Sequence, residues 1–237
     1  LCADLFLEPM QKYEDYGLAI SGLRKDSDGA KWLPGFSAKE REAFIALCLS
    51  GLIPSAEDNP SEGKYKLYTH QLEMLVRGVQ AGKPGVVTSG TGSGKTESFL
   101  LPIFAQISKE AASWPPSPSL DSWKPWWHAG TCAEPSYMRD AGIEAASRPK
   151  AMRAMILYPM NALVEDQLVR MRRALDSDAA HAAMDKHFGG NRIFFGRYTS
   201  ATKVTGWHQH PRLRDKREQD RSARKTEELR DYLETLE

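Results

Sequence analysis

The chain has 237 residues, of which 41% are hydrophobic and 27% are charged, as in an ordinary globular protein. Its formal net charge of +1 neither indicates nor excludes a nucleic-acid partner. It contains no apolar run long enough to cross a membrane, and we expect no signal peptide. Three widely spaced cysteines favour a reducing compartment over a disulfide framework. A cytoplasmic protein without a membrane partner is therefore predicted.

The pattern of residues 1–60 predicts a small helical region. Ser37 and Glu40 are spaced as a capping box, and the apolar helix pattern that follows them ends at Gly51. No residue pattern there points to chemistry, so we expect an accessory region that contributes packing. A polar, turn-rich stretch at 58–63 is the predicted boundary with the next domain.

The strongest chemical signal is the stretch 89–97, which has the sequence SGTGSGKTE. It lies between a predicted strand at 86–87 and an apolar helix pattern that begins near Lys95, which is the setting of a phosphate-binding loop. Lys95 can reach the β- and γ-phosphates, and the Thr96 hydroxyl can ligate Mg²⁺. The alternative is a glycine-rich surface turn that binds nothing. The predicted nucleotide-binding residues of the loop are Ser89, Gly90, Thr91, Gly92, Ser93, Gly94, Lys95, Thr96 and Glu97.

A second apolar helix pattern precedes the loop, and Gln71 lies near its start. A single glutamine on a helix is usually solvated. Its amide nevertheless offers both a donor and an acceptor, which can pair with the N6 and N7 edge of adenine.

Tyr68-x-x-Gln71 followed by residues 88–97 resembles the Q motif and motif I of the superfamily 2 DEAD/DEAH-box helicases. In that family the first loop position is commonly Ala or Ser, which accounts for Ser89 where the general pattern has glycine. The resemblance implies ATP rather than GTP, together with Mg²⁺. It also implies that Gln71 recognises adenine and that Tyr68 or a neighbour packs on the base.

Residues 110–150 are rich in proline and hold four of the six tryptophans, which predicts an insertion. Its aromatic side chains lie beside basic residues and could stack on bases. We favour a surface subdomain with its own small apolar cluster. His128 and Cys132 are too few to form a zinc site.

The apolar run at 155–158 predicts a buried strand, and a helix pattern follows Pro159, Met160 and Asn161. This segment is similar to motif Ia of the same helicases, which implies that these three residues lie near a nucleic-acid backbone. Asn161 as an ordinary helix N-cap is the alternative, and the two roles are compatible. The segment 158–163 also resembles a group of large bacterial helicases, some of which belong to anti-phage defence systems of the DISARM type.

A third strand is predicted at 192–195, and the turn after it contains Gly196, Arg197 and Thr199. In the helicase family a turn at this place lies beside the nucleic acid, so these residues are candidate phosphate contacts. A solvent-facing turn remains the alternative. Residues 206–237 are predicted to form a charged loop and a solvated helix.

These patterns predict an α/β fold in which residues 61–205 form the front half of a RecA-like domain, with a parallel sheet flanked by helices. No Asp-Glu box follows, and no second RecA-like domain is present. We therefore expect the chain to be the N-terminal ATP-binding part of a larger motor. Alone, it should bind ATP weakly or not at all and should not hydrolyse it, because hydrolysis needs the missing parts.

The predicted function of the intact protein is an ATP-dependent helicase or translocase that acts on DNA, with RNA as the second option. Other subunits of a defence complex are candidate partners. One alternative is a non-catalytic ATP-binding scaffold, which predicts no stimulation of ATP hydrolysis by nucleic acid. Another is a P-loop enzyme that acts on a small molecule, which the paired occurrence of the Gln71 and Pro159 motifs disfavours.

Overall fold

The structure is a computed structural model that describes residues 13–88, 90, 92–117, 151–199, 212 and 214–235. Ser89, Thr91, His128, Cys132 and most of the predicted insertion lie outside the described residues. The chain separates into two compact units, Leu1–Ser113 with Arg170–Phe188 and Trp114–Val169 with Gly189–Glu237. The predicted domain limits near residues 60 and 205 stay predictions.

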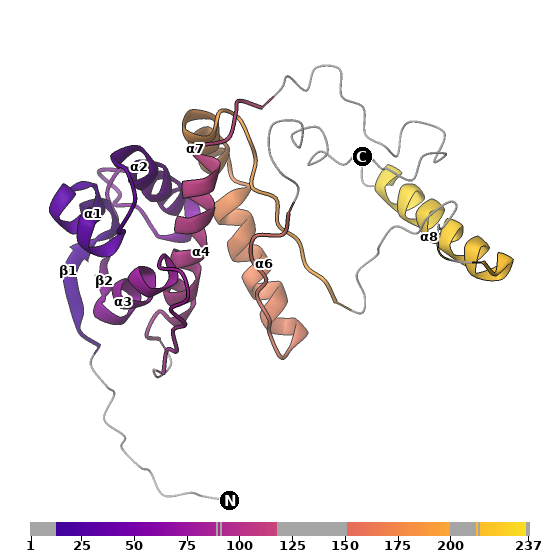
Figure 1. The fold of residues 1–237 in the computed structure, drawn as a ribbon, viewed down its shortest axis with the longest axis horizontal. Helices are drawn as coiled ribbons and strands as arrows, with labels where there is room; N and C mark the ends of the chain where they lie inside the picture. The colour runs from indigo at the N-terminus through magenta and orange to yellow at the C-terminus, as the bar shows by residue number, and fades with distance from the viewer. Residues whose placement is uncertain are drawn as a thin grey trace, which may run out of the picture. The chain divides into compact units, whose positions relative to one another are not determined.

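The first unit combines a small sheet with a group of helices (Figure 1). Its elements are β1 (Asp15–Ala19), the 3-10 helix η1 (Ile20–Arg24), α1 (Asp26–Trp32), α2 (Ala38–Leu47), the π-helical turn η2 (Cys48–Leu52), β2 (Lys66–Tyr68), α3 (Thr69–Gly78), α4 (Lys95–Ala111), α7 (Asp178–Phe188) and the C-terminal end of α6 (Asn161–Leu175). β1 and β2 pair antiparallel, with Asp15 opposite Tyr68. Because β2 leads directly into α3, this pairing fixes where α3 begins.

Helix α2 begins as its sequence predicts, but it ends at Leu47, and the predicted stop Gly51 lies in the π-helical turn η2 that follows. The Ser37 hydroxyl accepts a hydrogen bond from the Glu40 amide at 3.3 Å, and the Glu40 carboxylate accepts one from the Ser37 amide at 2.6 Å. The capping box is thereby confirmed. At the other end, Gly51 lies against the backbone of Arg173, where any side chain would collide.

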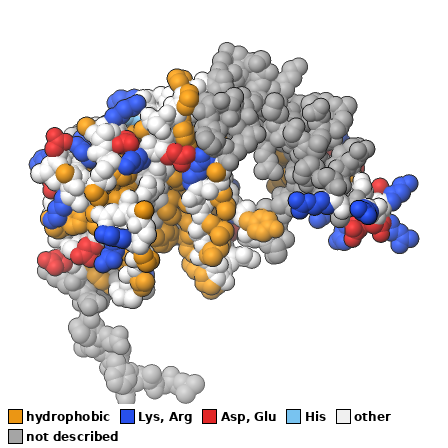
Figure 2. Space-filling model, in the orientation of Figure 1, with side chains coloured by type: hydrophobic (Ala, Val, Ile, Leu, Met, Phe, Trp, Pro, Cys, Tyr) orange, Lys and Arg blue, Asp and Glu red, His pale blue; other side chains and the backbone are white. Residues whose placement is uncertain are grey.

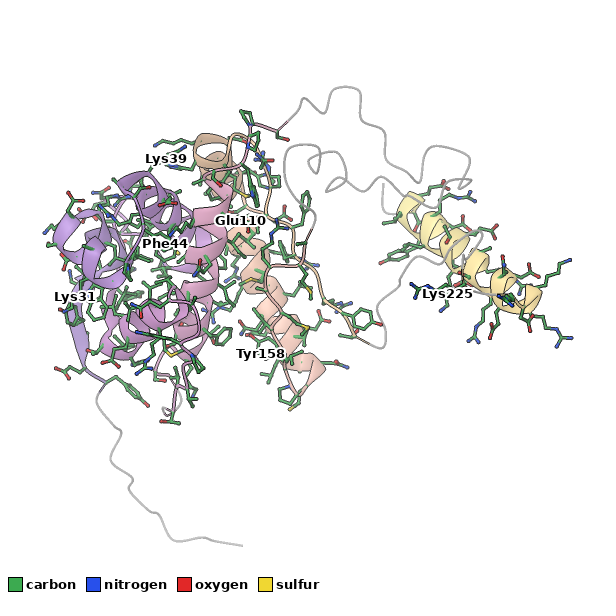
Figure 3. The ribbon with its side chains drawn as sticks, viewed as in Figure 1. Lys31, Lys39, Phe44, Glu110, Tyr158 and Lys225 are labelled. Atoms are coloured by element: carbon green, nitrogen blue, oxygen red, sulfur yellow. The ribbon has the colours of Figure 1, made fainter. Side chains whose placement is uncertain are left out.

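The core of this unit lies where α4 packs on α2 and α3. Phe44 of α2 points into the interior, whereas Lys31 and Lys39 lie on the outside (Figure 3). Each fully buried Leu or Phe contributes about 1.5–3 kcal/mol relative to an exposed one. The largest fully buried side chains on these three helices are Phe44, Ile45, Leu47, Leu72, Leu75, Leu100 and Leu101. α4 continues through Pro102, whose ring fits against Gly78 so closely that a side chain there would collide with it.

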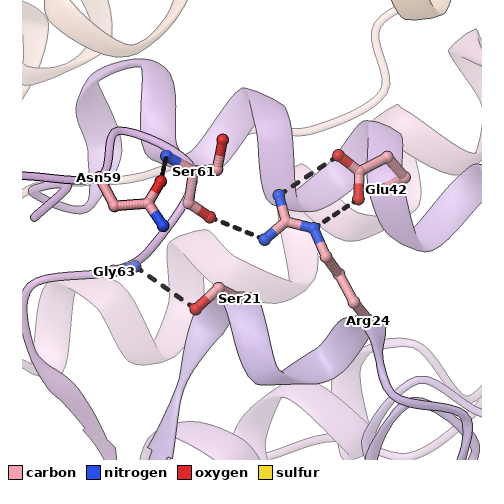
Figure 4. Close-up of polar contacts among 6 residues, drawn as sticks. All are labelled: Ser21, Arg24, Glu42, Asn59, Ser61 and Gly63. Carbon is pink, nitrogen blue, oxygen red and sulfur yellow. Dashed lines mark hydrogen bonds and ion pairs between the residues drawn. The ribbon is translucent and has the colours of Figure 1, made fainter.

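The predicted boundary at 58–63 is tied to the helices beside it (Figure 4). Arg24 donates to the Glu42 carboxylate at 2.6 Å and to the Ser61 carbonyl at 2.7 Å. Within the loop, the Ser61 amide donates to the Asn59 side chain at 3.1 Å. This stretch is therefore an anchored loop of the first unit.

Charges of both signs are interspersed over the visible face of the described residues (Figure 2). This mixture agrees with the net charge of +1. Among the described helices, none combines the length and the apolar character needed to span a bilayer.

The second unit contains the N-terminal part of α6 and the helix α8 (Lys216–Glu234). Segments distant in sequence meet there, since the Asn191 amide group donates to the Pro115 carbonyl and the Ser117 N–H donates to the Gly189 carbonyl, each at 2.8 Å. α8 begins after Asp215, whose carboxylate accepts from the Arg217 amide at 2.7 Å. The helix predicted near the C-terminal end is thus confirmed, and it starts further upstream than its apolar pattern indicated.

Three predicted strands are not formed in the described part of the chain. Residues 86–87, 155–158 and 192–195 belong to no strand, and the sheet in the described residues is the antiparallel β1–β2 pair. The prediction that the segment 155–158 is buried was wrong, because Met155 and Leu157 are 67% and 79% exposed. An apolar run does not make a parallel strand by itself, because neighbouring strands must supply its hydrogen bonds and helices must cover its faces.

Candidate nucleotide-binding site

The predicted phosphate loop lies directly before α4, which begins at Lys95 as expected. Gly92 and Gly94 have φ values of +75° and +69°, in the left-handed region that favours glycine. The Ser93 hydroxyl donates to the Gly90 carbonyl at 2.9 Å and closes the loop from within. The positive end of the α4 dipole therefore coincides with a backbone turn that only glycines adopt without strain.

Lys95 folds back over the loop, and its ammonium donates to the Gly90 carbonyl at 2.8 Å. The side chain is exposed, and an ammonium has three donors. It can therefore hold the loop and a phosphate oxygen together. Thr96 is half-buried in the first turn of α4, next to Lys95.

Gln71 is only 4% exposed and binds the loop through its amide group. Its Oε1 accepts from the Tyr68 amide at 2.9 Å, and its Nε2 donates to the Gly94 carbonyl at 3.1 Å. The glutamine thus caps α3 and contacts the phosphate loop, in addition to its predicted role at adenine. Its amide has a second N–H and a second lone pair with which a base could bond.

His70 and Tyr13 also lie beside the loop, and the sequence predicted a role for neither residue. The His70 Nε2 lies 2.9 Å from the Ser93 carbonyl, and its ring stacks on Tyr68 with centroids 5.5 Å apart and planes at 12°. Tyr13 packs edge-on against both rings, at 5.9 Å from Tyr68 and 6.2 Å from His70. The signal that could have found His70 is its place beside Gln71 at the start of α3.

Glu97, the last predicted residue of the loop motif, forms an ion pair with Arg170 of α6. Their side chains are 20% and 31% exposed, so the pair is partly shielded from water. Arg170 was not among the predicted site residues, because no local pattern marks it.

The candidate nucleic-acid residues lie in the second unit. Asn161 is the first residue of α6, which supports its position as a helix start, and Met160 is 61% exposed. Arg197 forms an ion pair with Glu165 in the first turns of α6. The structure thereby brings the turn that contains Gly196, Arg197 and Thr199 to the helix that follows Pro159.

The site consists of a glycine loop before a helix, a lysine that bonds to the loop, and an upstream glutamine that also bonds to it. These features define a P-loop nucleotide-binding protein. The family model of the DEAD/DEAH box helicases matches residues 68–194, more than half of the chain, so the chain belongs to this family. Membership confirms the resemblance predicted from the motifs and implies a RecA-like α/β fold. The match begins at Tyr68, so it contains the glutamine, the loop and the Pro159 segment.

Among characterised proteins, the chain is similar to Druantia protein DruE of Escherichia coli (strain UMEA 4076-1), with 37% identity over 141 residues. The matched region is 59% of this chain but only 6% of the relative, so the chain spans a small part of that protein's length. No solved structure matches the chain significantly.

Proposed function

We propose that this chain is the N-terminal ATP-binding part of a superfamily 2 helicase or translocase that acts on DNA. The observation that carries the proposal is the bond from Gln71 to the Gly94 carbonyl, because it joins the predicted adenine-recognising residue to the phosphate loop. Both residues lie within the region that matches the helicase family. The parallel sheet is proposed for the complete RecA-like domain of the intact protein.

ATP and Mg²⁺ fit the residues of the loop. A Cβ placed on Gly92 would meet nothing within 4 Å, so the backbone is open to an approaching phosphate. The N–H groups of the glycine loop would cradle the phosphates and Lys95 would neutralise them. The Thr96 hydroxyl is a hard oxygen ligand of the kind that Mg²⁺ prefers. Gln71 would recognise adenine, and Tyr68 would pack on the base.

Pro159, Met160 and Asn161, with Gly196, Arg197 and Thr199, would follow the nucleic-acid backbone. Backbone contacts of this kind are independent of sequence and weaken with salt. DNA is the proposed substrate and RNA the second option. The match to a Druantia protein supports the expected relationship to large bacterial defence helicases, and so a cytoplasmic complex with other defence subunits. The narrower DISARM-type resemblance stays a prediction.

Hydrolysis is proposed for the intact protein and not for these 237 residues alone. The sequence has no Asp-Glu-x-His or Asp-Glu-Ala-Asp box to hold Mg²⁺ and activate water. Phosphoryl transfer depends on positioning and on neutralising charge around the γ-phosphate, so the loop alone is insufficient.

The test is steady-state ATP hydrolysis by the intact protein, with and without single-stranded DNA, duplex DNA and RNA, beside Lys95→Ala. We expect one nucleic acid to stimulate ATP hydrolysis and Lys95→Ala to abolish this stimulation. The nucleic acid that stimulates hydrolysis would be identified as the substrate along which the protein moves. Bound ATP without turnover under any condition would favour the alternative of a non-catalytic ATP-binding scaffold.

A further inference from the structure

Two consecutive side chains at the start of α3 contact two consecutive carbonyls of the phosphate loop. His70 Nε2 lies 2.9 Å from the Ser93 carbonyl, and Gln71 Nε2 lies 3.1 Å from the Gly94 carbonyl. A carbonyl oxygen only accepts, so the His70 Nε2 must carry a hydrogen and donate it. α3 therefore contacts the loop through two neighbouring donors, each 23 positions upstream of its acceptor.

The planar trans peptide bond turns these contacts into an orientation of the loop. In such a bond the C=O and the N–H point in opposite directions. A Ser93 carbonyl that points to His70 directs the N–H of Gly94 away from α3. The Gly94 carbonyl accepts from Gln71 and also from the Ser98 amide of α4, so the helix and Gln71 together set the direction of the Lys95 N–H.

We propose that His70 is a positioning residue that orients the Gly94 N–H for binding to a nucleotide phosphate. The proposal rests on the proposed function, because it assigns a further residue to the same ATP site. It predicts that the His70 hydrogen bond contributes to the affinity for the phosphates and not for the base.

The surroundings of His70 hold its ring in this position. The imidazole stacks on Tyr68 at 5.5 Å, and Tyr13 packs edge-on against both rings. α3 also approaches the loop closely, because a side chain at Gly94 would collide with the Gln71 amide. The orienting bond is thus made by a ring that packs against two other aromatic rings, at a helix end that lies close to the loop.

The test compares His70→Phe with His70→Gln in the intact protein. Phenylalanine keeps a flat ring on Tyr68 but has no donor, whereas the glutamine amide places an N–H near the position of Nε2 but has no ring. Binding of ADP and of adenosine is measured by displacement of a fluorescent ADP analogue. Thermal melting of each variant reports whether it folds.

We expect His70→Phe to weaken ADP binding on the order of fivefold, the value of one net hydrogen bond, and to leave adenosine unchanged. His70→Gln should bind ADP within about twofold of the wild type, since the donor is retained. Equal ADP affinity in His70→Phe and wild type would overturn the proposal. So would a loss in His70→Gln as large as in His70→Phe, because the ring would then matter and not the donor. If His70→Phe does not fold, His70→Leu takes its place as the variant that lacks the donor.

Lys95→Ala separates this inference from the proposed function. If the wild type binds no ADP, or binds it as well as Lys95→Ala does, the nucleotide site itself is refuted. If the wild type binds ADP in a Lys95-dependent way and His70→Phe changes nothing, only the role of His70 fails.

Discussion

Glu97 and Arg170 form an ion pair although 73 positions separate them in the sequence. Glu97 lies in the first turn of α4, directly after the lysine and threonine of the phosphate loop. Arg170 lies on α6, the helix that begins at Asn161. The pair therefore joins the first turn of α4 to the part of α6 that belongs to the first unit.

Arg170→Gln should uncouple these two parts. Without its partner, the partly buried Glu97 carboxylate loses an attraction of up to about 1 kcal/mol. The melting temperature should therefore fall by a few degrees. We expect the stimulation of ATP hydrolysis by DNA to decrease more than the basal rate in the intact protein. Arg172→Gln, an exposed change on the same helix, is the matched control. Identical stimulation in both variants would show that the pair is only structural.

Gly94→Ala should weaken nucleotide binding, because it adds a collision with the Gln71 amide to the strain of a left-handed φ of +69°. Gly82→Ala is the control, since Gly82 has a φ of +71° but nothing within 4 Å of an added Cβ. Both variants should lose about 1–2 kcal/mol of stability from backbone strain. Only Gly94→Ala should lose ADP affinity, by more than about tenfold in titrations. Normal ADP binding by Gly94→Ala would contradict the tight approach of α3.

The features that the sequence predicted correctly are those whose determinants lie within a few residues. The Ser37–Glu40 capping box and the start of α4 at Lys95 need only neighbouring positions. The contacts of His70 and Arg170 were not predicted, because their partners lie 23 and 73 positions away in the sequence. A pattern of neighbouring residues does not indicate which distant residues will come into contact. The predicted strand at 155–158 failed for a related reason, since a strand exists only through partners that its own residues do not specify.

Cys48 is fully buried, and this burial raises the pKa of its thiol well above the usual value. The thiol should resist iodoacetamide in the folded protein and react on unfolding, which is measured in a variant with Cys2→Ser and Cys132→Ser. Because the unfolded thiol ionises first, stability should fall as the pH rises above the unfolded pKa of about 8.5. Cys48→Ala should remove the part of this decline that comes from the thiol, as followed by urea unfolding at several pH values. Rapid labelling of the native protein would show that Cys48 is accessible.

The ion pair between Arg197 and Glu165 predicts two changes of opposite sign in nucleic-acid binding. Arg197→Gln should weaken binding of single-stranded DNA by the intact protein and reduce the slope of log affinity against log salt by about one. Glu165→Gln should strengthen binding, because it removes a carboxylate that competes with phosphate for the same guanidinium. Fluorescence anisotropy at several salt concentrations measures both effects. If both variants bind DNA as the wild type does, the turn at 196–199 faces solvent and the nucleic acid follows another surface. If both bind more weakly, the ion pair supports the turn structurally, and Arg197 acts through the fold rather than through a phosphate contact.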